Sequence, residues 1–123
     1  MSAVTTHDRL LRRDYWMVLF RPVAGTSAAD IGARVDDHLT WLLAAEAQGT
    51  VLLSGPLLDG PDTAPGSGMA VLRVASADEA AALASQDPFV LAGLRTFDVY
   101  RWQVNEGSIS ITLSLGTATY VWH

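Results

Sequence analysis

The order of apolar and polar segments repeats once along this chain, and this repeat limits the fold more than any other feature of the sequence. Residues 15–20 (Tyr-Trp-Met-Val-Leu-Phe) are aromatic or apolar throughout, which predicts a strand in the middle of a sheet. The apolar residues that follow recur at helical spacing, after Ser27 and Asp30 in a pattern close to a helix-capping box. Gly49 ends this pattern, and residues 50–54 predict a second strand.

The second half of the chain predicts the same succession of elements. Residues 69–74 predict a strand, and an S-x-x-E capping box that starts at Ser76 predicts a second helix. Asp87, followed by a proline, interrupts the helical pattern and predicts a short separate helix over residues 89–94. Residues 96–103 predict the fourth strand.

Two consecutive strand–helix–strand units are typical of a ferredoxin-like α+β sandwich (βαββαβ), in which two helices cover one face of a four-stranded antiparallel sheet. We expect the other face to carry large side chains, such as those of Tyr15, Met17, Leu19 and Val99 or their neighbours. An exposed apolar face of this size is usually buried against a partner. The pattern therefore predicts a homodimer joined through the open sheet faces.

The chain of 123 residues is long enough for one domain with a hydrophobic core. We expect residues 1–14, which are polar and charged, to form a flexible N-terminal arm with one short helical turn at residues 9–13. Residues 15–104 hold the two repeated units and are expected to form the folded domain. Residues 105–123 are expected to form a C-terminal β extension.

Segments outside the repeated units leave alternatives open. Residues 108–115 alternate strictly between polar and apolar side chains, which predicts a strand, and residues 119–122 predict a further short one. These strands either extend the main sheet or cross to the other subunit of the dimer. Residues 59–67 are rich in Gly, Pro and Asp and form either a lid over a site or a plain connection.

Composition excludes several classes of function. The formal net charge of −5 argues against binding to nucleic acid or to an anionic membrane surface. No apolar run approaches the roughly 18 residues that a membrane helix needs. The chain has no cysteine, which excludes thiolate chemistry and fits a cytoplasmic protein. Because paired-histidine motifs and glycine-rich nucleotide loops are also missing, we expect no metal and no cofactor.

Two residues, one in each half of the chain, are the candidates for chemistry. His38 lies on or beside the apolar stripe of the first predicted helix, and a histidine exchanges protons near neutral pH. Asp87 would orient it if the fold brings the two together. Each residue also has a purely structural explanation, because His38 fits a packing position and Asp87 fits a helix N-cap.

Four further residues are candidates for substrate binding: Ser54, Gly55, Arg21 and Trp41. Ser54 and Gly55 end a predicted strand and offer a hydroxyl and backbone N–H groups, although turn geometry alone explains them. Arg21 stands at a strand end, where it would bind a carboxylate or simply face solvent. Trp41 either stacks on a ligand or packs in the core or the dimer interface.

A set of short motifs occurs in a fixed order over residues 15–103. The motifs are His38-Leu39, Trp41-Leu42, Gly49, Ser54-Gly55-Pro56-Leu57, Gly68, Ala75-Ser76, Glu79-Ala80, Asp87-Pro88-Phe89, Gly93-Leu94 and Trp102. With this ordered set the chain resembles the YCII-related (YciI-like) family of the dimeric α+β barrel superfamily.

The resemblance implies a dimeric α/β barrel and an active centre formed by a histidine and an aspartate near a cleft, which are His38 and Asp87 in this chain. It also implies a cofactor-independent lyase or isomerase that transfers protons on small oxygenated cyclic or aromatic compounds, as in dehydrochlorination or muconolactone isomerisation. The alternative is a non-catalytic dimer that binds a small ligand or serves as an accessory protein.

Overall fold

The computed structural model describes residues 7–123, and the contacts between residues divide the chain into two units. The larger unit comprises residues 14–103, which hold both strand–helix–strand repeats. The smaller unit combines residues 104–123 with the N-terminal segment up to Arg13.

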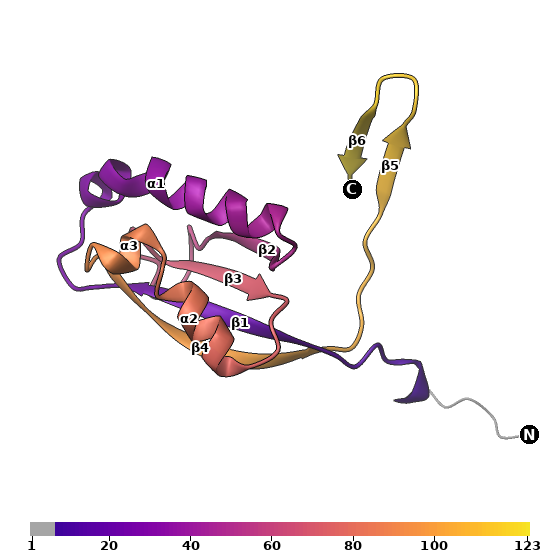
Figure 1. Cartoon of the computed structure of the whole chain (residues 1–123), viewed down its shortest axis with the longest axis horizontal. Coiled ribbons are helices and arrows are strands. Elements are labelled where there is room, and N and C mark those ends of the chain that lie inside the picture. The colour runs from indigo at the N-terminus through magenta and orange to yellow at the C-terminus, as the bar shows by residue number, and fades with distance from the viewer. Residues whose placement is uncertain (1–6) are drawn as a thin grey trace, which may run out of the picture. The chain divides into compact units, whose positions relative to one another are not determined.

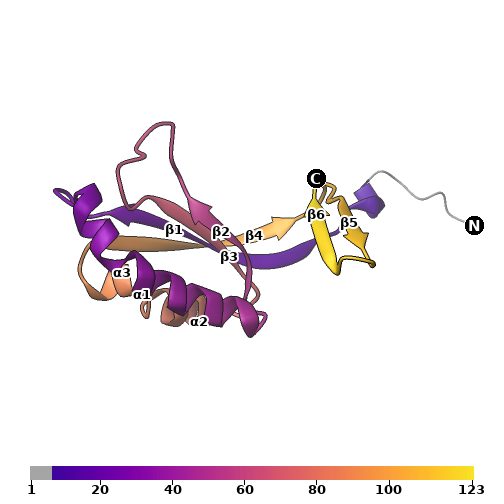
Figure 2. The ribbon, with the colours of Figure 1, turned by 90° about the horizontal axis from the view of Figure 1, so that it is seen from above.

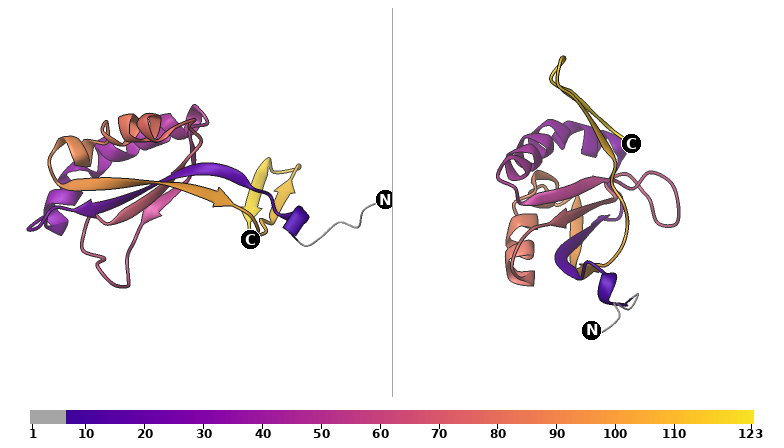
Figure 3. Two further views of the ribbon diagram at one scale, coloured as in Figure 1. Left: turned by 90° about the horizontal axis from the view of Figure 1, so that it is seen from below. Right: turned by 90° about the vertical axis from the view of Figure 1, so that its right-hand side faces the viewer.

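The larger unit has the ferredoxin-like fold that the repeat predicts. Its elements are β1 (Arg13–Pro22), α1 (Ala28–Ala47), β2 (Val51–Pro56), β3 (Gly68–Leu72), α2 (Ala77–Ala84), α3 (Pro88–Leu91) and β4 (Arg95–Val104). The strands form a four-stranded antiparallel sheet in the order β2-β3-β1-β4, so each crossover helix connects strands that are not neighbours. All three helices lie on the same face of this sheet (Figures 1, 2 and 3). The prediction of an α+β sandwich is therefore confirmed.

Alternate residues of the central strands build the core beneath the helices. Val18 of β1 lies opposite Ala70 of β3, and both are buried in the cluster that α2 covers with Ala80 and Ala84. Small alanines on α2 let the helix approach the sheet closely, while the larger side chains of β1 fill the layer between them. Phe20 continues the same face of β1 towards the end of the strand.

The opposite face of the sheet is also apolar, as predicted. Val99, which was predicted to lie on this face, lies on the other one. Tyr15, Met17 and Leu19 alternate with the core residues of β1 and therefore point away from the helices. Val99 instead packs against the core cluster, and its neighbour Tyr100, which is 44% exposed, points to the open face.

Local signals set most element ends. Ser27 and Asp30 form the predicted capping box of α1, and the hydrogen bonds from Ser27 lower the pKa of Asp30. Gly49, with φ +80°, follows the end of α1 in the left-handed conformation that glycine favours. Helix α3 ends at Leu91, earlier than predicted, because Gly93 with φ +74° turns the chain there.

The smaller unit is a hairpin with a short N-terminal segment. Strands β5 (Ile111–Ser114) and β6 (Thr119–Trp122) pair antiparallel in a two-stranded sheet of their own. The predicted strand over residues 108–115 is thus shorter than expected. The N-terminal helical turn falls at His7–Arg9 rather than at residues 9–13, and residues 1–6 of the predicted arm lie outside the described residues.

Candidate active site

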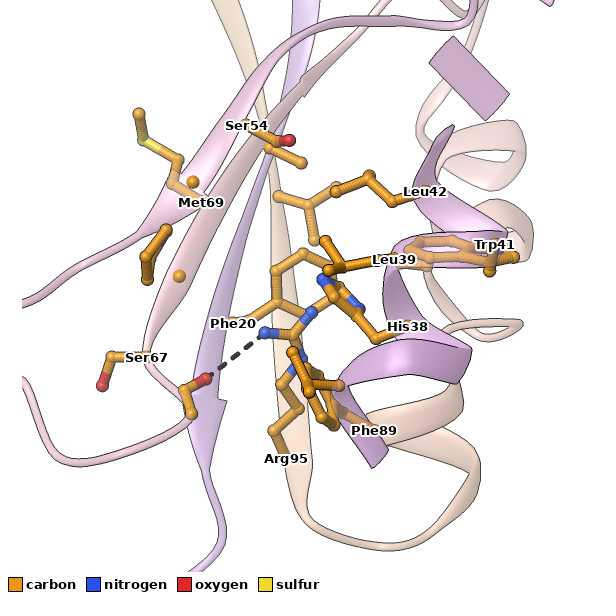
Figure 4. A pocket seen from close by; sticks show the side chains of 18 of the residues that line it. Phe20, His38, Leu39, Trp41, Leu42, Ser54, Ser67, Met69, Phe89 and Arg95 are labelled. Carbon is orange, nitrogen blue, oxygen red and sulfur yellow. Dashed lines mark hydrogen bonds between the residues drawn. The ribbon is translucent and has the colours of Figure 1, made fainter. Parts of the chain in front are cut away.

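A cavity of about 380 Å³ opens between α1 and the core face of the sheet (Figure 4). Its walls are mainly apolar side chains, among them Leu39 and Leu42 of α1. The polar side chains that line it are those of His38, Ser54, Ser67 and Arg95. The cavity thus offers a small organic molecule apolar walls and a few fixed polar contacts.

His38 stands on the wall of this cavity, and the fold brings it to Asp87. Its Nδ1 lies 2.7 Å from Oδ1 of Asp87, although the two residues are 49 positions apart in the sequence. The imidazole stacks on the ring of Phe89, with centroids 4.4 Å apart, and the side chain is 14% exposed. The juxtaposition on which the predicted acid–base pair depends is present, at direct hydrogen-bond distance.

Asp87 is fully buried and accepts several hydrogen bonds at once. Oδ1 accepts the backbone N–H of Phe89 at 3.2 Å, which makes Asp87 the N-cap of α3, as predicted. Oδ2 accepts Nε of Arg95 at 2.7 Å and lies 2.6 Å from Nη2 of the same guanidinium. Burial by itself raises the pKa of Asp87, but the hydrogen bond from His38 and the charge of Arg95 outweigh it and hold the pKa below its ordinary value.

Arg95 is a member of the site that the sequence analysis did not single out. It opens β4, its side chain is 6% exposed, and its guanidinium lies 3.8 Å from the centroid of the Phe20 ring. Burial lowers the pKa of Arg95 and the Asp87 carboxylate opposes this, so the guanidinium stays charged at neutral pH. Arg95 lies on the same face of β4 as Phe97, but the predicted strand began one residue later, so the alternation of that strand did not include Arg95.

The charges of this cluster determine which atoms of His38 are free. Because the ionised Asp87 can only accept hydrogen bonds, Nδ1 of His38 donates the proton between them. Asp87 and Arg95 carry opposite charges at hydrogen-bond distance, so they form a buried ion pair beside His38. Among the described residues, no protein group is bonded to Nε2, the other ring nitrogen of His38. Nδ1 of His38 is thus engaged by Asp87, and the residue itself lines the cavity.

The predicted substrate-binding residues divide into two groups. Ser54, Gly55 and Trp41 line the cavity, and the Trp41 ring lies 5.8 Å from that of His38. Arg21 does not belong to this site. It follows Phe20 in the same strand and therefore points to the opposite face of the sheet, where it is half exposed and paired with Asp98.

The fold and the site define a ferredoxin-like α+β domain with a buried His–Asp–Arg cluster beside an apolar cavity. Residues 16–103 match the model of the YCII-related domain, and the chain belongs to this family. None of the curated proteins matches the chain.

A solved structure of a dehydrochlorinase is similar to most of this chain. It is 5-chloro-2-hydroxyhydroquinone dehydrochlorinase (TftG) from Burkholderia phenoliruptrix AC1100, in complex with 2,5-dihydroxybenzoquinone. The similarity has a TM-score of 0.60 with 22% sequence identity, and it covers 72% of this chain and 92% of that one. This likeness supports the fold.

Within residues 7–123, no group of three His, Cys, Asp or Glu side chains is placed to hold a metal ion. In the same range no helix combines the length and the apolar character that crossing a bilayer requires.

Proposed function

We propose that this protein is a cofactor-independent lyase or isomerase that transfers protons on a small oxygenated cyclic or aromatic compound. The observation that carries the proposal is the 2.7 Å contact between His38 Nδ1 and Asp87 Oδ1 at the wall of the cavity. Nε2 of His38 would take a proton from a carbon next to a carbonyl group, and Asp87 would stabilise the imidazolium that forms. The dehydrochlorinase named above, a structural neighbour, suggests the class of reaction.

The second half of the reaction differs between the two classes. In an isomerase, His38 returns the proton to a different carbon of the same compound. In a lyase, the electron pair left by the proton forms a double bond and expels a leaving group such as chloride. Both need only the proton shuttle of one histidine and no further reactant.

The cavity sets the size of the substrate. Its volume of about 380 Å³ lies at the small end of ligand sites, which suits a compound with a single ring. Ser54 and Gly55 line the wall near the sheet, and we propose that they contact polar substituents of that ring.

His38→Gln tests the proposed chemistry. The amide keeps a polar side chain of similar size but cannot carry the proton, so we expect turnover to fall by about 10²- to 10⁴-fold. The measurement is turnover over a panel of chlorinated hydroquinones and lactones, followed by chloride release and ultraviolet absorbance. His123→Gln is the matched control, since His123 bonds Thr112 in the hairpin and not the cavity. Full activity in His38→Gln would show that the assignment is wrong.

A non-catalytic ligand-binding role is the alternative, and the mainly apolar walls of the cavity favour it. It predicts that the wild-type protein binds ring compounds of the panel and converts none of them. It also predicts equal affinities for the wild type and His38→Gln, because an apolar wall would supply the binding energy.

We also propose that the protein is a homodimer joined through the open sheet face. Met17, Leu19 and Met69 place apolar groups there, and Leu19 lies opposite Met69 in the strand register. Covering this face would remove a contiguous apolar surface from water.

A further inference from the structure

Arg95 has hydrogen-bonding capacity that its partners in the protein do not use. A guanidinium carries five N–H donors. Asp87 engages Nε and Nη2 at 2.7 and 2.6 Å, which leaves Nη1 on the other side of the group. Among the described residues, the only hydrogen-bond acceptor of Nη1 is the carbonyl oxygen of Gly66, at the long distance of 3.4 Å (Figure 4). Nη1 is therefore the most weakly bonded nitrogen of a side chain that is only 6% exposed, and it can still donate to a ligand in the cavity.

Gly68 keeps space open beside this atom. It lies on the cavity side of β3, opposite Phe20, and it lines the cavity. A Cβ atom at this position would stand 3.4 Å from Arg95 Nη1 and 3.3 Å from the carbonyl oxygen of Gly55. Any side chain there would therefore occupy the approach to Nη1, whereas glycine leaves it to a ligand.

His38 and Arg95 face the same cavity and are tied to one carboxylate. His38 contacts Oδ1 of Asp87 and Arg95 contacts Oδ2, so the distance between the base and the guanidinium is held by a single rigid group. Both side chains line the cavity, and both are stacked against Phe89. One flat molecule can thus contact His38 along one edge and the guanidinium of Arg95 along the adjacent edge.

We propose that Nη1 of Arg95 binds the oxyanion of the ligand, a phenolate or enolate oxygen on a ring. This inference rests on the proposed function for the step that forms the charge. When Nε2 of His38 removes a proton, the C–H electron pair becomes a carbon–carbon double bond and the carbonyl π electrons move to oxygen. The new negative charge then lies beside Nη1, in a site of low polarity where a fixed cation acts strongly.

The inference is tested by binding rather than by turnover, so that its failure is separable from failure of the proton-transfer proposal. The probes are 2,5-dihydroxybenzoquinone, whose hydroxyl groups ionise, and 2,5-dimethylbenzoquinone, which has methyl groups in their place. Affinities are measured by calorimetry at pH 7 for the wild type and for Gly68→Ala. This variant leaves the contacts between Arg95 and Asp87 in place and fills the approach to Nη1 with a methyl group.

We expect Gly68→Ala to bind the dihydroxy compound about tenfold or more weakly, which is the value of a hydrogen bond to a charged group. Binding of the dimethyl compound should change by less than about threefold. Equal affinities of wild type and variant for the dihydroxy compound would overturn the inference. So would equal weakening for both compounds, which would indicate crowding alone, or no binding of the dihydroxy compound to the wild type.

Arg95→Met provides a second, independent measurement. It should bind the dihydroxy compound weakly and the dimethyl compound at least as well as the wild type. Arg73→Met is the matched control, because Arg73 bonds the carbonyl oxygens of Gly49 and Val51 and does not line the cavity. Both affinities should be unchanged in this control. Since Arg95→Met removes half of a buried ion pair and can fail to fold, Gly68→Ala decides the question by itself.

Discussion

Replacing Asp87 with Asn tests whether a buried carboxylate holds the site together. The amide can still accept the backbone N–H of Phe89, so the cap of α3 is largely kept. It carries no charge, however, and Arg95 is left as a buried cation with no counterion. Breaking a buried pair in this way costs about 3–5 kcal/mol. That is a large share of the roughly 5–15 kcal/mol by which most domains are stable.

The assay is urea denaturation followed by tryptophan fluorescence, with the free energy of unfolding compared at pH 7. Asp98→Asn is the matched control, since it breaks the exposed pair between Asp98 and Arg21 on the open face of the sheet. Solvent screens that pair, so its loss should change the unfolding free energy by less than about 1 kcal/mol. The reasoning is refuted if Asp87→Asn is as stable as the wild type.

The pH dependence gives a second check on the same variant. The pKa of Asp87 is lower in the folded protein than in the unfolded chain, where an aspartate has a pKa of about 3.9. The carboxylate therefore contributes its full stabilisation above that unfolded value and loses it as the pH falls through the folded value. The difference in unfolding free energy between wild type and Asp87→Asn should therefore shrink as the pH falls below about 4. A difference that stays constant into strong acid contradicts the assignment.

Three further predictions concern the helix caps, the open face and the hairpin. Ser76→Ala removes the side-chain oxygen that accepts the backbone N–H of Glu79. The free energy of unfolding, measured by urea denaturation, should therefore fall by about 1 kcal/mol. An unchanged value would show that this cap does not stabilise the protein. Leu19→Glu places a charge on the open sheet face and should convert the proposed dimer into a folded monomer, as measured by light scattering after gel filtration; an unchanged mass would exclude that face as the interface. Residues 105–123 belong to the smaller unit, so their removal should change the melting temperature of the remaining domain by only a few degrees relative to the full chain. Loss of the folded state in this variant would contradict the prediction.

The fold was accessible from the sequence because its signals are local and agree with one another. Residues 15–20 are apolar on both faces of a strand, and β1 is central in the sheet with one face against the helices and the other apolar. Capping residues at Ser27 and Ser76 mark the starts of α1 and α2. These features depend on neighbours within a few positions, which is the range that periodicity and capping rules cover.

The facing of individual strand residues was harder to predict. In β4 both alternating sets contain large side chains, Phe97 and Val99 on one side and Tyr100 and Trp102 on the other, so alternation alone does not identify the core face. Arg21 raised a different problem. Pro22 indicates the end of a strand, but β1 continues to that residue, and Arg21 therefore keeps the strict alternation that points it away from the cavity.

Arg95 shows why the site could be predicted only in part from the sequence. Its partner Asp87 is already explained by its local role as the N-cap of α3. No sequence pattern around Asp87 indicates that both of its carboxylate oxygens accept hydrogen bonds. Only the fold reveals that Asp87 accepts from His38, from Phe89 and from Arg95 together. The consequence is chemical as well as structural. Burial raises the pKa of Asp87, but the hydrogen bond from His38 and the charge of Arg95 hold it below its ordinary value, so the carboxylate stays ionised and can only accept hydrogen bonds. The cation that the local patterns do not single out therefore holds the second oxygen of the carboxylate whose first oxygen contacts His38.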